Sequence, residues 1–184
     1  MNKIYGLINE FAPVRQDASR TIISYGMQPE ADGEHATWFE VDFYKKQIGK
    51  PSLEAIKTAV KADINARTDE KILKGFVWTP QGGQPITIWL SEENQRNFSE
   101  AQRIAAAMPE AILPVTFKLG ETAEGEPIYH EFQTAEELTD FYLQAVSYVN
   151  QQLAAGWQEK DSIDWGPYDP ENVVAPKKTR KSSK

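Results

Sequence analysis

The sequence contains no cysteine and only two histidines, and these shortages exclude several kinds of chemistry. Without thiols there is no disulfide, no cysteine nucleophile and no cysteine-ligated zinc or iron–sulfur centre. The two histidines, His35 and His130, could bind a metal ion only together with carboxylates, and no spacing in the sequence indicates such a set. We therefore expect neither a metal ion nor a cofactor.

Long apolar runs are also missing. No stretch approaches the length of about 20 residues that crosses a bilayer, and residues 104–108 are typical of an alanine-rich helix. The N-terminal residues MNKIYGLINEF reach Asn9 and Glu10 before the apolar region of a signal peptide can form. The sequence thus predicts a cytoplasmic protein, with a host cytoplasm included, and no membrane association.

Positive charge is the scarcer sign, with 20 Lys and Arg against 27 Asp and Glu and a net charge of −7. An acidic surface repels phosphate, so binding of a nucleic-acid duplex is not expected to be the main function. The last eight residues are the exception, and weak contact with nucleic acid, an acidic partner or a second copy of the acidic body is conceivable there. A solvated end without a specific function is the simplest interpretation. The basic residues are Lys177, Lys178, Arg180, Lys181 and Lys184.

The first 49 residues predict a β meander that forms an N-terminal domain. In residues 38–44 apolar and polar side chains alternate, which is the period of a strand with one buried face. Asp32–Gly33 supplies turn chemistry before it. The three strand candidates are residues 4–11, 21–27 and 38–44.

A linking helix is expected next, because Gly49 and Pro51 interrupt the strand pattern and Ser52 can cap a helix. Apolar residues then recur every three or four positions, as on the buried face of a helix. They are Leu53, Ile56, Val60 and Ile64.

The clearest internal signal is a repeat of the order strand, turn, strand, helix. The first copy has strands at 72–78 and 85–90 and a helix from Ser91, and the second has strands at 113–119 and 127–132 and a helix from Thr134. Ser91 and Thr134 are good N-caps, and Glu137 completes a capping box. Matching positions are Gly83 with Gly125, Pro85 with Pro127, Ile86 with Ile128, Leu90 with Phe132 and, after one inserted residue, Phe98 with Phe141.

Two copies are too few for a solenoid, so the repeat predicts a pseudo-symmetric antiparallel sheet with helices packed on one face. The predicted fold class is therefore α+β. An N-terminal meander over residues 1–49 is followed by an α+β domain over residues 50–168 that holds the linking helix and two ββα units.

Three aromatic residues, Trp157, Trp165 and Tyr168, follow Gly156, where the last helix is expected to end. Because the periodicity is lost there, these side chains could anchor a partner. Clamping of the segment onto the protein's own sheet is the simpler role. Residues 169–184 are rich in Pro and Lys and offer little to bury, which predicts a disordered tail.

The best candidate for chemistry is His130, because an unperturbed histidine titrates near neutral pH. Strand alternation places it on the same face as Ile128 and Phe132, where a hydrogen-bonded structural histidine is the usual finding. His35 falls in a predicted turn beside Glu34, as an exposed loop histidine would.

Pairs of carboxylates could serve a glycosidase if they faced each other across a cleft. Glu92–Glu93 and Glu136–Glu137, however, lie in the opening turns of predicted helices, where acidic side chains favourably oppose the macrodipole. A third group, Asp161 to Asp164, has no such explanation.

Other motifs are weak. Gly82–Pro85 lacks the lysine and hydroxyl of a phosphate-binding loop and predicts a hairpin turn, and no serine lies in a G-x-S-x-G elbow. Strand aromatics could form a platform for sugar or peptide, although core packing is the common role of such residues. These aromatics are Trp38, Trp78, Trp89, Tyr5, Tyr25 and Tyr44.

Several long segments carry a family resemblance. They are KPSLEAIKTAVKADINARTDEKILKGFVW, PITIWLSEENQRNFSEA, LPVTFKLGE and FQTAEELTDFYLQAVSYVNQQLAAGWQEKD, within residues 50–164. Their order resembles a family of uncharacterised domains encoded in bacteriophages and prophages, often near tail genes. The resemblance includes no catalytic motif and carries over no functional residue. It implies a phage-encoded structural or assembly component, with the host cytoplasm or the virion as its location.

We therefore expect a non-catalytic binding or assembly protein that contacts a protein partner or itself, rather than an enzyme. One alternative is a small hydrolase that acts on glycans, which requires two acidic side chains about 5–10 Å apart in an aromatic-lined cleft. Another is a nucleic-acid accessory protein whose binding weakens steeply with salt and is lost when residues 177–184 are removed.

Overall fold

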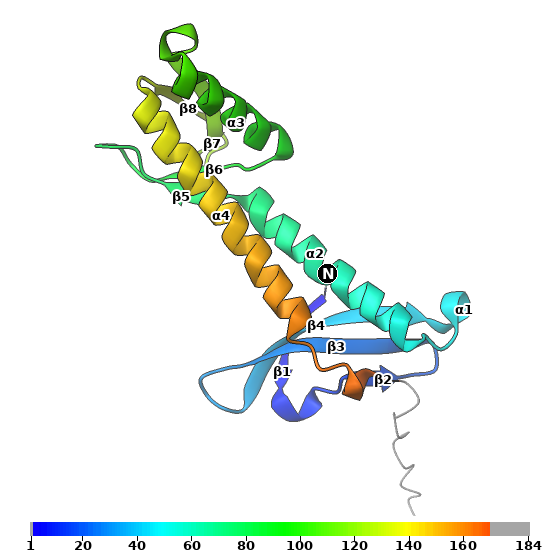
Figure 1. Ribbon diagram of the computed structural model, residues 1–184. Coiled ribbons are helices and arrows are strands. Elements are labelled where there is room, and N and C mark those ends of the chain that lie inside the picture. The colour runs from blue at the N-terminus through cyan, green and yellow to red at the C-terminus, as the bar shows by residue number, and fades with distance from the viewer. Residues whose placement is uncertain (1, 170–184) are drawn as a thin grey trace, which may run out of the picture. The chain divides into compact units, whose positions relative to one another are not determined.

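The structure, a computed structural model, describes residues 2–169 and shows an α+β protein (Figure 1). The chain divides into two compact units. Unit 1 comprises residues 1–64 and 159–184, and unit 2 comprises residues 65–158. This division differs from the predicted boundary after residue 49, because the first part of the linking helix belongs to the N-terminal unit. The predicted tail, apart from Asp169, lies outside the described residues.

Unit 1 contains a four-stranded antiparallel sheet with the strand order β1-β4-β3-β2. The sheet is therefore a meander of β2, β3 and β4 with β1 added beside β4, rather than a simple meander in chain order. The strands are β1 (Asn2–Leu7), β2 (Val14–Gln16), β3 (Arg20–Pro29) and β4 (His35–Tyr44).

Two local predictions for this sheet were wrong. The first strand ends at Leu7, and the chain forms the 3₁₀ helix η1 (Ile8–Glu10) where the strand was expected to continue. Strand β2 was missed, because its three residues are too few to show a period of two. After β4 the chain forms the short helix α1 (Lys45–Ile48).

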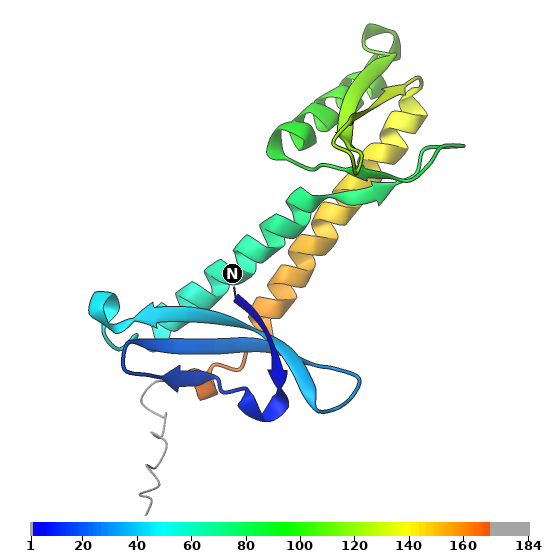
Figure 2. The same ribbon diagram turned by 180° about the vertical axis from the view of Figure 1, so that it is seen from behind.

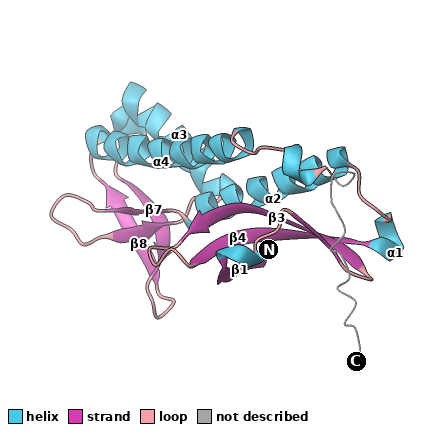
Figure 3. Ribbon diagram, turned by 90° about the horizontal axis from the view of Figure 1, so that it is seen from below, coloured by secondary structure: helices cyan, strands magenta, loops and turns pink. Residues whose placement is uncertain are grey.

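One face of this sheet packs against helix α2 (Leu53–Lys74), and Figure 3 shows α2 alongside β3 and β4. On the helix side Ile56, Val60 and Ile64 are fully buried, since a spacing of four keeps them on one stripe. On the sheet side the same core contains Ile23 and Tyr25. Each such side chain contributes about 1.5–3 kcal/mol when fully buried, so this stripe fixes the helix on the sheet.

Helix α2 continues to Lys74, so the strand predicted over residues 72–78 begins too early. Ile72 is buried and lies eight residues after Ile64, which extends the helical stripe by two turns. Gly75, with a φ of 77°, ends the helix, and strand β5 (Phe76–Trp78) follows.

Unit 2 contains the repeated hairpin–helix order that the sequence predicts. The first copy consists of β5, β6 (Ile86–Ile88) and α3 (Glu92–Ala107), and the second consists of β7 (Val115–Glu121), β8 (Pro127–Phe132) and α4 (Ala135–Asp161). The 3₁₀ helix η2 (Pro109–Ala111) connects them. Figures 2 and 3 show α3 and α4 on one side of the β7–β8 hairpin.

The two hairpins form separate two-stranded sheets instead of one continuous sheet. They meet where the backbone N–H of Trp89 donates to the carbonyl of Leu119 over 2.9 Å.

The matched positions of the repeat lie together in one core. Leu90 and Phe132 are fully buried, as are Phe98 and Phe141, whose ring centroids are 4.9 Å apart. Both predicted N-caps are present, since Ser91 Oγ accepts from Asn94 N–H and Thr134 Oγ1 accepts from Glu137 N–H, each over 3.2 Å. The repeat is therefore structural.

Helix α4 does not end at Gly156 as predicted, but continues to Asp161. Gly156 is a packing residue, because a Cβ atom there would lie 2.5 Å from Oγ1 of Thr68 on α2. Glycine permits this close approach of two helices, a use that its sequence context does not distinguish from a helix stop.

Candidate binding site

The three aromatic residues proposed as partner contacts are placed differently by the structure. Trp157 lies on α4 and is 56% exposed, whereas Trp165 and Tyr168 lie beyond the helix with ring centroids 5.6 Å apart. Tyr168 is buried in the core of unit 1, and Trp165 packs against that core. Burial, followed by the carboxylate of Asp164, raises the pKa of the Tyr168 hydroxyl. Trp165 and Tyr168 thus hold residues 165–168 against the core of unit 1. Of the three aromatic residues, only Trp157 is largely exposed.

His130 is part of a hydrogen-bonded cluster in unit 2. Its Nε2 lies 2.9 Å from Oε1 of Glu137, and its ring meets Trp78 edge-on at 5.0 Å. The other oxygen of Glu137 accepts from the backbone N–H of Gln133 over 3.3 Å. These contacts join His130 on β8 to Glu137 in the first turn of α4.

His35 begins β4 instead of lying within a turn. Its Nδ1 is 2.8 Å from Asp32 Oδ2, and its ring stacks on Tyr5 at 5.2 Å. Asp32 also accepts two backbone hydrogen bonds, so this cluster closes the β3–β4 hairpin.

The six strand aromatics fall into two groups. Trp38, Trp78 and Tyr25 are at most 2% exposed and belong to the cores. Trp89, Tyr5 and Tyr44 are 39–63% exposed. A platform of all six is wrong, because half of them face inward.

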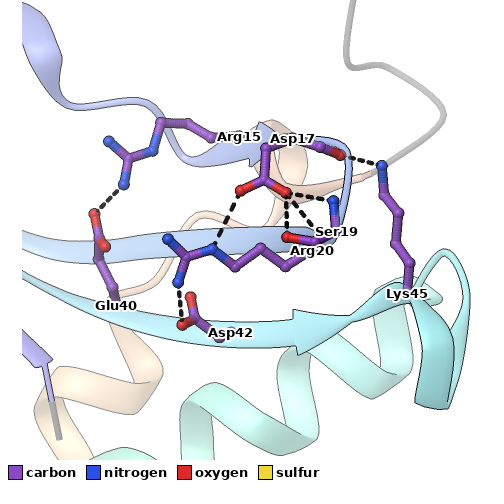
Figure 4. Close-up of polar contacts among 7 residues, drawn as sticks. All are labelled: Arg15, Asp17, Ser19, Arg20, Glu40, Asp42 and Lys45. Atoms are coloured by element: carbon purple, nitrogen blue, oxygen red, sulfur yellow. Dashed lines mark hydrogen bonds and ion pairs between the residues drawn. The ribbon is translucent and has the colours of Figure 1, made fainter.

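The polar face of the unit 1 sheet carries a set of charges that neutralise one another (Figure 4). Arg15 pairs with Glu40 over 2.5 Å, and Arg20 pairs with Asp42 over 2.7 Å. Glu40 Oε1 also accepts from Trp38 Nε1 over 3.0 Å. These guanidinium groups are already matched by carboxylates, so the cluster is better suited to holding β2, β3 and β4 together than to binding an anion.

The Glu40→Ala substitution is expected to destabilise the protein by about 1.5–3 kcal/mol. The side chain of Glu40 is only 9% exposed, and its loss removes the acceptor of both Arg15 and the Trp38 indole. Urea unfolding followed by circular dichroism measures the change, and the Trp38 indole N–H resonance should shift. Glu34→Ala, at an exposed turn position, is the control. Equal stability of the two variants would contradict the assignment.

Asp17, at the turn between β2 and β3, makes a pH-dependent contribution to the free energy of unfolding. Its carboxylate accepts the backbone N–H groups of Ser19 and Arg20 over 2.7 and 2.8 Å, and these bonds, in that order, lower its pKa below the ordinary value of 3.8. A lowered pKa in the folded state stabilises the fold above pH 3.8, and the contribution is lost as the pH falls through the lowered pKa. The unfolding free energy of Asp17→Asn should therefore fall less steeply below pH 4 than that of the wild type. Superimposable pH profiles would refute this.

The carboxylate pairs are placed as helix-stabilising residues. Glu92 and Glu93 lie in the first turn of α3, and Glu136 and Glu137 lie in the first turn of α4. Asp164 accepts the backbone N–H of Gly166 over 3.0 Å. Within residues 2–169 no three His, Asp or Glu side chains are arranged to hold a metal ion. None of the helices in that range has both the length and the apolar character needed to cross a membrane.

The described cavity of unit 2 lies between α3 and α4 and has a volume of about 120 Å³. Its apolar lining comprises Leu90, Phe98, Tyr142, Ala145, Val146 and Val149. Gln95 and Asn150 add carboxamides, and none of the eight lining residues is an Asp, Glu, His, Lys or Arg. The pocket can accept an apolar group and offers no acid or base for chemistry.

Two hydrogen bonds lie beside this pocket. Gln95 Nε2 donates to the carbonyl of Leu90 over 2.7 Å, and the Tyr142 hydroxyl donates to Ser99 Oγ over 3.4 Å. These bonds connect α3 to Leu90, two residues after β6, and to α4. Buried Phe98 and Ala145 pack beside these contacts in the pocket wall.

The sequence pattern does not predict this site. The apolar stripe at residues 142, 145, 146 and 149 has helical spacing and was visible, but such a stripe by itself predicts only a buried face. The opening depends on how α3 meets α4, which the sequence pattern does not specify.

The fold and the pocket define an α+β protein built around a duplicated hairpin–helix unit. The chain belongs to the family described as Domain of unknown function (DUF4376), which it matches over residues 55–175. This supports the resemblance to an uncharacterised domain family, and the match extends beyond the range of 50–164 that the quoted segments cover. Comparison with curated proteins and with solved structures found no match.

Proposed function

We propose that the protein is a non-catalytic binding module that holds an apolar side chain of a protein partner in the pocket between α3 and α4. The observation that carries the proposal is the composition of this pocket, which has six apolar residues, two carboxamides and no acidic or basic group. Clefts that bind ligands are typically apolar with a few polar groups that orient the ligand. A volume of about 120 Å³ suits one aliphatic or aromatic side chain.

The charge of unit 2 indicates the kind of partner. Residues 65–158 contain thirteen acidic and six basic residues, so a partner surface that surrounds the apolar anchor with basic or neutral groups is favoured. The resemblance to phage and prophage domains supports a role in a virion or its assembly, with the tail as the structure concerned. The host cytoplasm and the particle are then the places where the partner is met.

The alternative of a glycan hydrolase draws no support from this pocket, because no carboxylate lines it. The alternative of nucleic-acid binding depends on Lys177 to Lys184, which lie outside the described residues. Removal of these eight residues tests it directly, since phosphate-driven binding would be lost and would weaken steeply with salt.

The test uses Val146→Gln, which places a polar side chain in the pocket lining, and Leu143→Gln as the matched control. Leu143 lies three residues earlier on α4, is 59% exposed and does not line the pocket. Proteins retained from lysogenic or infected cells are identified, and the purified partner is titrated against each variant by calorimetry. We expect Val146→Gln to weaken binding at least about tenfold, a loss of 1.4 kcal/mol, and Leu143→Gln to leave it unchanged. Equal affinities for both variants, or a chain that binds no protein, would refute the proposal.

A further inference from the structure

We propose that the occupant of the α3–α4 pocket is the C-terminal segment of a second copy of this chain, with Val173 or Val174 as the inserted side chain. This inference rests on the proposed function and names its partner. It makes the protein self-associating through two different surfaces, a pocket on one copy and a terminal segment on the next.

The chemistry of the pocket suits a branched aliphatic side chain. Leu90 and Phe98 are at most 1% exposed and Ala145 is 5% exposed, so the innermost wall is apolar. An empty apolar cavity of about 150 Å³ holds a benzene molecule, and a pocket of about 120 Å³ therefore has room for the methyl groups of valine. The exposed carboxamide of Asn150 can exchange hydrogen bonds with the backbone of an incoming segment.

The sequence of the C-terminal segment supplies matching features. Val173, Val174 and Ala175 precede a run of five basic residues within positions 177–184. In no other part of the sequence does an apolar triplet lead into so dense a positive cluster. Its five positive charges complement unit 2, where acidic residues exceed basic ones by seven. Opposite charge raises the rate of encounter, and burial of the valine would then hold the segment in place.

The family match gives an independent reason to include these valines. It extends to residue 175, six positions past Asp169, and so includes Val173 and Val174 while ending before Lys177. The matched range therefore includes the apolar part of the segment and excludes the basic run. The two valines and the pocket thus fall within the range of one domain match.

A contact between a pocket and a terminal segment is heterologous, since the two surfaces differ. Two copies that exchange their segments form a closed dimer, and successive copies that do not close form longer assemblies. Both outcomes make the mass in solution depend on concentration.

The test measures the mass of the full-length protein by sedimentation velocity over a hundredfold range of concentration. We expect association that weakens at least tenfold in the double variant Val173→Ser/Val174→Ser. Val146→Gln should have the same effect, and Leu143→Gln should have none. An excess of a synthetic peptide of residues 170–184 should dissociate the wild-type assemblies, and the same peptide with both valines changed to serine should not.

The results that would overturn the inference can be distinguished from those that would overturn the proposed function. A wild-type monomer at all concentrations, or association that the serine substitutions leave unchanged, overturns the inference. If self-association fails in this way but Val146→Gln weakens binding of another protein, the proposed function stands and only the identity of the partner changes. If Val146→Gln alters neither self-association nor partner binding, both proposals fail. Loss of association on adding salt, with no effect of the serine substitutions, would show contact through charge alone and would also overturn the inference.

Discussion

Replacement of Gly75 by alanine is expected to destabilise unit 2 by more than about 4 kcal/mol, a loss found only for exceptional single substitutions. Gly75 has a φ of 77°, and an ideal Cβ atom there would lie 1.5 Å from the carbonyl oxygen of Ile88. That oxygen belongs to the backbone of β6, which pairs with β5 immediately after Gly75, so no side-chain rotation can relieve the overlap. The end of α2 and the first hairpin would have to separate.

Gly82→Ala is the matched control for this experiment. Gly82 has a similar φ of 71°, but no atom lies within 4 Å of the position of its Cβ. Its substitution therefore reports the cost of the left-handed conformation alone, which is about 1 kcal/mol. Urea unfolding followed by circular dichroism compares the two variants. If Gly75→Ala proved as mild as Gly82→Ala, the close approach of Gly75 to β6 would be wrong.

Phe141→Ala should cost about 3–5 kcal/mol, because it empties the centre of the unit 2 core. Phe141 is fully buried, and its ring centroid lies 4.9 Å from that of Phe98, 5.0 Å from that of Trp78 and 5.1 Å from that of Phe132. Truncation forfeits the burial of the ring and leaves a cavity that these neighbours cannot fill without moving. The near-ultraviolet circular dichroism signal of Trp78 should weaken, and the free energy of unfolding should fall.

Leu143→Ala provides the comparison on the same helix. Leu143 is 59% exposed, so its truncation should change the unfolding free energy by no more than about 0.5 kcal/mol. The difference between the two variants separates core packing from helix propensity, since both introduce alanine into α4. A loss below about 1 kcal/mol for Phe141→Ala would be incompatible with the described core.

The parts of the fold that the sequence predicts best are those with a long or repeated pattern. The stripe from Leu53 to Ile64 predicts the first part of α2, and matched positions such as Leu90 and Phe132 predict two hairpin–helix units. Hydroxyl N-caps locate the starts of α3 and α4 to within one residue. Local chemistry is sufficient in these cases, because the side chain and the backbone groups it satisfies are close in sequence.

The errors occur where one residue type has two uses. Gly156 could end a helix or allow close packing, and only the position of Thr68 decides between them. Trp38 alternates with Phe39 and so shares a strand face with Glu40, yet it is 2% exposed because Phe11 and Gly6 cover it. Such outcomes depend on partners distant in sequence.

The candidate site was the least predictable part. Its lining combines residues of the first hairpin–helix copy, such as Leu90 and Phe98, with residues of the second, such as Ala145 and Val149. Each set by itself has the pattern of an ordinary helix or strand core. The pocket depends on how α3 packs against α4. The residues of neither helix taken alone predict that packing.

The shared core of the two copies limits how they can change during evolution. Phe98 and Phe141 occupy equivalent positions and touch each other, so each copy completes the interior of its twin. A fragment that carried one copy would expose an aromatic surface in place of a core, and substitution on one side would demand compensation on the other. The two hairpin–helix copies therefore form one folding unit, and a substitution of Phe98 is expected to change the surroundings of Phe141 directly.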